Sequence, residues 1–65
     1  MRRAVAKSTD LIAIDYEEII NTSLQAIRFR IDGRPHWLPR REILVDEEEK
    51  TVTMPEWLAV NEGIV

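Results

Sequence analysis

The strongest constraint on the fold is a stretch of strict alternation that ends in an Asp-Gly pair. Apolar and basic residues alternate over residues 26–31, so the isoleucines and the phenylalanine lie on one face of a strand and both arginines on the other. Asp32-Gly33 follows, and this dipeptide accepts the positive φ angles of a type I′ turn. Residues 34–39 then return as a second strand. The pattern predicts a β-hairpin.

The register of this hairpin follows by counting outward from a two-residue loop. The predicted pairs are Ile31 with Arg34, Arg30 with Pro35, Phe29 with His36, Arg28 with Trp37, and Ile27 with Leu38. One face, predicted to be buried, then carries Ile27, Phe29, Ile31 and Leu38. The other carries Arg28 and Arg30 beside Trp37, where a guanidinium can lie on the indole ring. Pro35 lacks a backbone donor, which predicts an edge position for the second strand.

The segments on either side of the hairpin predict further strands and one helix. Residues 11–20 favour a strand that is bent or broken, although Glu17-Glu18 is also compatible with a helix, and Asn21-Thr22-Ser23 favours a turn. Residues 39–42 predict a tight turn. A second hairpin is expected from residues 43–45 and 51–54, joined by an acidic loop. Pro55 at the first helical position and Gly63 just past the end predict a helix of about two turns.

These elements predict a mostly β fold. We expect a small, strongly bent antiparallel sheet of about four or five strands, or a five-stranded barrel of Src-homology or Sm-like type, with a short C-terminal helix. An α+β fold is the alternative if residues 11–20 are helical. Residues 1–10 are expected to be a flexible N-terminal tail, and residues 11–65 a single domain. The predicted core is Ile14, Ile19, Ile27, Phe29, Ile31, Leu38, Ile43, Val45, Val52, Met54, Trp57 and Leu58.

Length and composition exclude several classes of protein. A chain of 65 residues without cysteine is too short for a multidomain enzyme and cannot form a disulfide-bonded secreted module. No apolar run approaches the roughly 20 residues of a membrane-spanning helix, and the N-terminus lacks the apolar stretch of a secretory signal. A cytoplasmic location is therefore expected.

The sequence offers no pattern for catalysis or for a cofactor. His36 is the only histidine, so a typical zinc site cannot be assembled, and two glycines cannot build a phosphate-binding loop. No serine or threonine has a plausible base partner. The acidic run at residues 46–49 lacks the ligand spacing of a calcium loop. We expect no enzymatic activity, no catalytic, cofactor or metal site, and no cofactor.

Two oppositely charged segments are the candidate binding features. The net charge of −3 hides +4 over residues 26–41, where five arginines face Asp32, and −6 over residues 42–65, where seven acids face Lys50. The candidate partner-binding residues are Arg28, Arg30, Arg34, Trp37, Arg40 and Arg41. The acidic loop comprises Asp46, Glu47, Glu48 and Glu49, and it could mimic a phosphate backbone toward a basic partner such as a nuclease.

Three binding functions agree with this composition. Arginines beside an exposed aromatic ring are typical of protein-binding hot spots and also of single-stranded nucleic-acid platforms. Self-association into a ring or dimer is the third function. The plain alternative is a strand face whose arginines lie over Trp37 or bond to nearby acids and keep the sheet in solution. The leading hypothesis is a non-enzymatic protein-binding module with no membrane partner.

The chain also resembles a group of short, uncharacterised bacteriophage and prophage proteins. The matching features are the Asp32-Gly33 hairpin, the Trp37-Leu38-Pro39 step and the C-terminal Pro55-Glu56-Trp57-Leu58-Ala59 run, so the resemblance covers roughly residues 19–65. The group more often has Lys-Ser-Gln where Arg40-Arg41-Glu42 stands here. The resemblance implies a phage or mobile-element origin, hence the cytoplasm of a host cell. It also implies an accessory role, for instance in replication and recombination or as an inhibitor of host defence.

Overall fold

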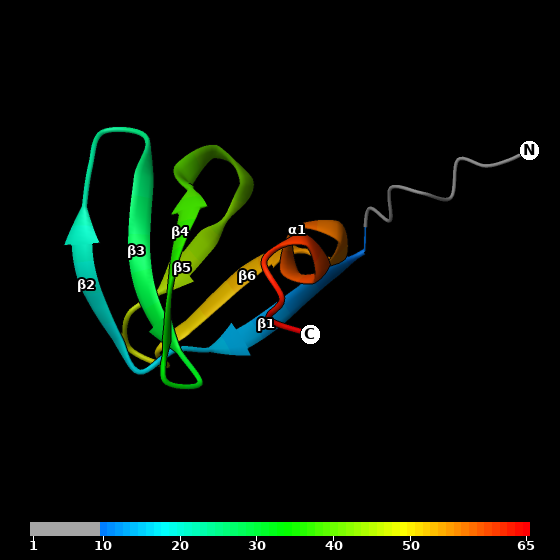
Figure 1. Ribbon diagram of the computed structural model, residues 1–65, viewed down its shortest axis with the longest axis horizontal. Coiled ribbons are helices and arrows are strands. Elements are labelled where there is room, and N and C mark those ends of the chain that lie inside the picture. The colour runs from blue at the N-terminus through cyan, green and yellow to red at the C-terminus, as the bar shows by residue number, and fades with distance from the viewer. Residues whose placement is uncertain (1–9) are drawn as a thin grey trace, which may run out of the picture.

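The computed structural model describes residues 10–65, in which six strands precede one helix (Figure 1). The predicted tail over residues 1–10 lies, apart from Asp10, outside this range. The elements are β1 (Leu11–Asp15), β2 (Glu18–Thr22), β3 (Ala26–Ile31), β4 (Arg34–Pro39), the 3-10 turn η2 (Arg40–Glu42), β5 (Leu44–Asp46), β6 (Thr51–Pro55) and α1 (Glu56–Asn61). The predicted mostly β fold with a short C-terminal helix is confirmed.

The strands form two antiparallel sheets of three strands each, in the orders β1-β6-β5 and β2-β3-β4. Tyr16 and Glu17 link the two sheets where the predicted strand over residues 11–20 breaks. The Tyr16 amide donates to the Lys50 carbonyl at 3.0 Å, in the loop of one sheet. The next amide, of Glu17, donates to the Arg30 carbonyl of the other sheet at 2.8 Å. The helical alternative for residues 11–20 is therefore wrong.

The β3–β4 hairpin has the predicted geometry. All five predicted pairs occur, and a sixth joins Ala26 to Pro39. Asp32 and Gly33 have φ angles of 54° and 80°, as a type I′ turn requires. β4 pairs only with β3 in its sheet, so Pro35 lies in an edge strand as expected.

Two local predictions need correction. The turn predicted at Asn21-Thr22-Ser23 lies further along, because Asn21 and Thr22 pair with β3 and the chain reverses at residues 23–25. In that turn, the Ala26 amide donates to the Ser23 hydroxyl at 3.0 Å. Pro55 is the residue before α1 rather than its first residue, since its ψ angle of 144° is extended.

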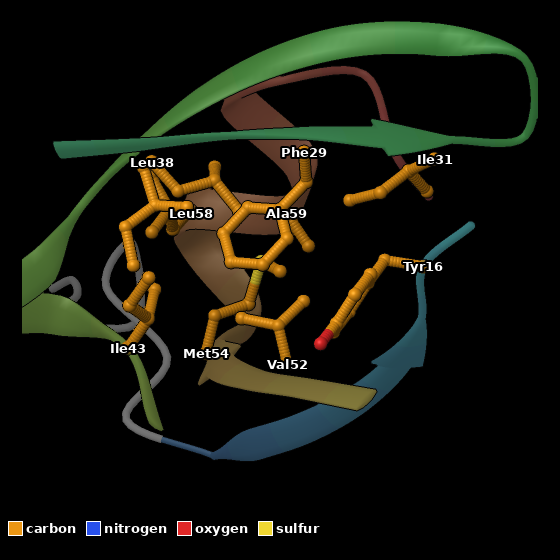
Figure 2. Close-up of a cluster of buried hydrophobic side chains, with 10 residues drawn as sticks. Tyr16, Phe29, Ile31, Leu38, Ile43, Val52, Met54, Leu58 and Ala59 are labelled. Carbon is orange, nitrogen blue, oxygen red and sulfur yellow. The ribbon is translucent and has the colours of Figure 1, made fainter. Parts of the chain in front are cut away.

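The core lies between the two sheets and beneath α1 (Figure 2). Phe29 and Leu38 from one sheet meet Val52 and Met54 from the other, and all four are fully buried. The ring of Tyr16 packs against Phe29, with 4.9 Å between centroids. The other buried core residues are Ile27, Ile31, Ile43, Leu58 and Ala59.

The predicted core differs from the observed one in residues at its periphery. Ile14, Ile19 and Val45 pack against the core but are only partly buried, because β1, β2 and β5 are edge strands of their sheets. Trp57 of α1 is partly buried as well. Tyr16 and Ala59, which the sequence analysis omitted, are core residues.

Candidate interaction surface

The fold distributes the predicted arginine cluster over three places. Arg28 and Arg30 project from the outer face of β3, opposite the core. Arg34 follows the β3–β4 turn at one end of the sheet. Arg40 and Arg41 belong to η2, at the other end. The cluster expected as one surface is therefore three separate groups.

Arg28 and Trp37 form the centre of the outer face. They are cross-strand partners, and the Arg28 Cζ atom lies 6.0 Å from the centroid of the indole ring. A guanidinium at this distance is attracted by the negative face of the ring. Arg28 Nη1 also donates to Asn21 Oδ1 at 3.4 Å, whereas its buried Nε has no hydrogen-bond partner within residues 10–65. Trp37 remains 46% exposed beside this contact.

Arg30 is neutralised by an ion pair within the sheet. Its Nη1 donates to Glu18 Oε2 on the neighbouring strand β2. Both side chains are about half exposed, so the pair adds little to stability. The pair does occupy the guanidinium. Arg30 therefore behaves as in the alternative in which the arginines of the strand face bond to nearby acids.

A cleft of about 590 Å³ lies at the end of the sheet where η2 meets the β2–β3 turn. We call it the Leu24 cleft; its lining residues are Leu24, Gln25, Pro39, Arg40 and Arg41. The Arg40 amide donates to the Gln25 carbonyl, and Arg40 Nε to the Ser23 carbonyl, both at 2.9 Å. These two bonds fix the walls relative to each other.

Leu24 is the functional candidate that the sequence analysis missed. Its side chain is 96% exposed at the tip of the β2–β3 turn. The available signal was an apolar residue between Ser23 and Gln25, directly after the predicted turn.

Acidic residues gather at the opposite end of the β2-β3-β4 sheet, which is the lower end in Figure 1. The β3–β4 turn, the link between β1 and β2, and the loop after β5 meet there. Glu17 connects them, because its carboxylate accepts the Gly33 amide at 3.2 Å and its carbonyl accepts Lys50 Nζ at 2.9 Å. Asp46 Oδ1 accepts the amides of Glu48 and Glu49, which shapes the loop. The acidic side chains at this end are Glu17, Asp32, Asp46, Glu47, Glu48 and Glu49, against Arg34 and Lys50.

Two further titratable groups have structural contacts rather than a reactive arrangement. Burial raises the pKa of the Tyr16 hydroxyl above its ordinary value of 10.0, and the charges of Glu47 and Asp46 raise it further. His36 Nδ1 lies 3.3 Å from Glu62 Oε1, which ties the end of α1 to β4. Over residues 10–65, no three His, Asp or Glu side chains are grouped to hold a metal ion.

Comparisons with protein families, curated proteins and solved structures gave no match for this chain. In the part of the chain that the structure describes, no helix has the length and apolar character needed to cross a membrane.

Proposed function

We propose that this chain is a non-enzymatic protein-binding module whose contact surface is centred on Trp37. The observation that supports this proposal best is the Arg28–Trp37 pair, a half-exposed indole in contact with a guanidinium on the face of an edge strand. Trp and Arg are the residues most enriched in binding hot spots, and side chains that are already ordered lose little entropy on binding.

On the outer face, a protein partner agrees with the state of Arg28 and Arg30 better than a nucleic acid does. A single-strand platform needs cations free to meet phosphates and an aromatic face free to stack on a base. Here Arg30 is paired with Glu18, and Arg28 lies over the ring of Trp37.

The resemblance to phage and prophage proteins adds an accessory role to the proposal. A small binding module of this origin would act on a host protein, for instance as an inhibitor of a defence or nucleic-acid enzyme. The acidic loop, Asp46 to Glu49, would then be a second contact for a basic partner.

The proposal is tested by affinity capture from a bacterial lysate with the wild-type chain and two variants. We expect Trp37→Ala to lose a partner that the wild type retains, because it removes the centre of the surface. Leu44→Ala is the matched control, since Leu44 is also an exposed apolar residue but lies on the other sheet. Circular dichroism must show that both variants are folded.

The proposal is wrong if folded Trp37→Ala captures the same partner as the wild type. It is also wrong if the captured material is single-stranded nucleic acid whose binding weakens steeply with added salt.

A further inference from the structure

The Leu24 cleft combines an exposed apolar side chain with two cations, and this combination specifies a class of partner. We propose that the cleft binds an acidic protein segment that has an apolar side chain between carboxylates. The apolar side chain contacts Leu24 and Pro39, and the carboxylates pair with Arg40 and Arg41. This inference rests on the proposed function, because it names the chemistry of the partner at one end of the same sheet.

The apolar part of the argument concerns Leu24. A leucine that is 96% exposed at the tip of a turn adds no buried area to the core. Pro39 lines the same cleft and adds a second apolar surface. Contact with an apolar side chain of a partner would remove both surfaces from water. Nucleic-acid backbones offer no such group, so this feature favours a protein segment.

The charged part of the argument concerns Arg40 and Arg41. Among residues 10–65, neither guanidinium has a carboxylate within 4.0 Å, in contrast to Arg30. The bond from Arg40 Nε to the Ser23 carbonyl orients this side chain and leaves its two terminal nitrogens as donors. An arginine oriented in this way is suited to a carboxylate, which accepts two parallel bonds.

Among residues 10–65, no carboxylate of the chain pairs with Arg40 or Arg41; Glu42 belongs to η2 itself but forms no salt bridge with either guanidinium. The acidic loop and Glu17 lie at the other end of the sheet, beyond the full length of β3 (Figure 1). A carboxylate that pairs with these two arginines would therefore come from another molecule.

The inference is tested with labelled synthetic peptides and fluorescence anisotropy at low salt. The probe is a short peptide of alternating glutamate and leucine. The comparison peptides replace either glutamate by lysine or leucine by serine, and oligothymidylate tests for nucleic acid. We expect binding of the glutamate-leucine peptide alone.

Variants locate the binding on the protein. Substituting Arg40→Gln and Arg41→Gln together should weaken binding by at least about tenfold, because charge-assisted hydrogen bonds are lost. Leu24→Ser should also weaken it. The controls are Arg34→Gln, which removes one arginine charge at the opposite end, and Leu44→Ser, which removes an exposed leucine from the other sheet; both should leave binding unchanged.

Several results would overturn the inference. They are equal binding of the leucine and serine peptides, tighter binding of oligothymidylate, or unchanged affinity in the double arginine variant. If sedimentation shows that the wild-type chain self-associates and that the double arginine variant does not, the cleft binds the acidic end of a second copy instead. If the peptides fail while capture still depends on Trp37, this inference falls and the proposed function stands.

Discussion

Replacing Gly33 tests whether the β3–β4 turn requires glycine because of its backbone conformation or because of its packing. Gly33 has a φ angle of 80°, and a Cβ atom built there meets no other atom within 4 Å. The left-handed backbone costs an L-residue roughly 1–2 kcal/mol. Alanine also lowers the conformational entropy of the unfolded chain, which stabilises the folded state by about 0.4–1 kcal/mol. Gly33→Ala should therefore lower the free energy of unfolding by about 1 kcal/mol.

The D-amino acid reverses the sign of this effect. D-alanine adopts positive φ without strain and keeps the benefit in the unfolded chain, so it should stabilise the protein by about 0.4–1 kcal/mol. A chain of 65 residues is short enough for chemical synthesis of both variants. Gly63 is a matched second site, because its φ angle is 72° and its surroundings are equally open. Gly63→Ala should cost about the same as Gly33→Ala.

Urea denaturation followed by tryptophan fluorescence measures these differences. The slope of the unfolding free energy against urea should stay constant, since the same surface is exposed in every variant. In thermal unfolding, about 1 kcal/mol corresponds to roughly 4–8 °C in a domain of this size. If D-alanine and L-alanine destabilise equally, or if L-alanine costs more than about 3 kcal/mol, steric contact rather than backbone conformation governs the turn.

Two further predictions concern the core. The raised pKa of Tyr16 means that the folded state holds this proton more tightly than the unfolded state does, so stability is fully present below about pH 10 and falls above it. Tyr16→Phe should therefore lose less stability than the wild type between about pH 9 and about pH 11, as measured by urea midpoints. An equal loss of stability in both proteins would show that Tyr16 is not the group responsible. Met54→Ala empties a fully buried position and should cost about 2–5 kcal/mol, comparable to the whole stability expected of so small a domain. Met54→Leu should cost less than about 1.5 kcal/mol by the same denaturation, and an equally small loss in Met54→Ala would show that the site is loosely packed.

The hairpin was predictable because its determinants are local. Alternation over residues 26–31 defines the buried face, and the Asp32-Gly33 turn then sets the register of every pair. The division into two sheets depends on hydrogen bonds from Tyr16 and Glu17 to residues far along the chain, which no local pattern contains. Tyr16 shares the parity of Ile12 and Ile14, so an inward position was indicated, but its place at the chain reversal masked it.

The candidate surface was less predictable than the fold. Sequence proximity grouped five arginines, although strand geometry sends Arg34 to one end of the sheet and Arg40 to the other. The contact of Arg28 with Trp37 followed from the register and is confirmed. The Leu24 cleft depends on the β2–β3 turn meeting η2, and this meeting requires the folded sheet.

The opposite charges at the two ends of the β2-β3-β4 sheet give the molecule an electric dipole along its strands. The electric field of a charged partner would therefore orient the protein before contact, with η2 toward an anion and the acidic loop toward a cation. This orientation shortens the search for a productive encounter and fades as salt screens the field over about 10 Å. Association through the Leu24 cleft should consequently become slower with added salt, while dissociation, which depends on short-range contacts, changes less.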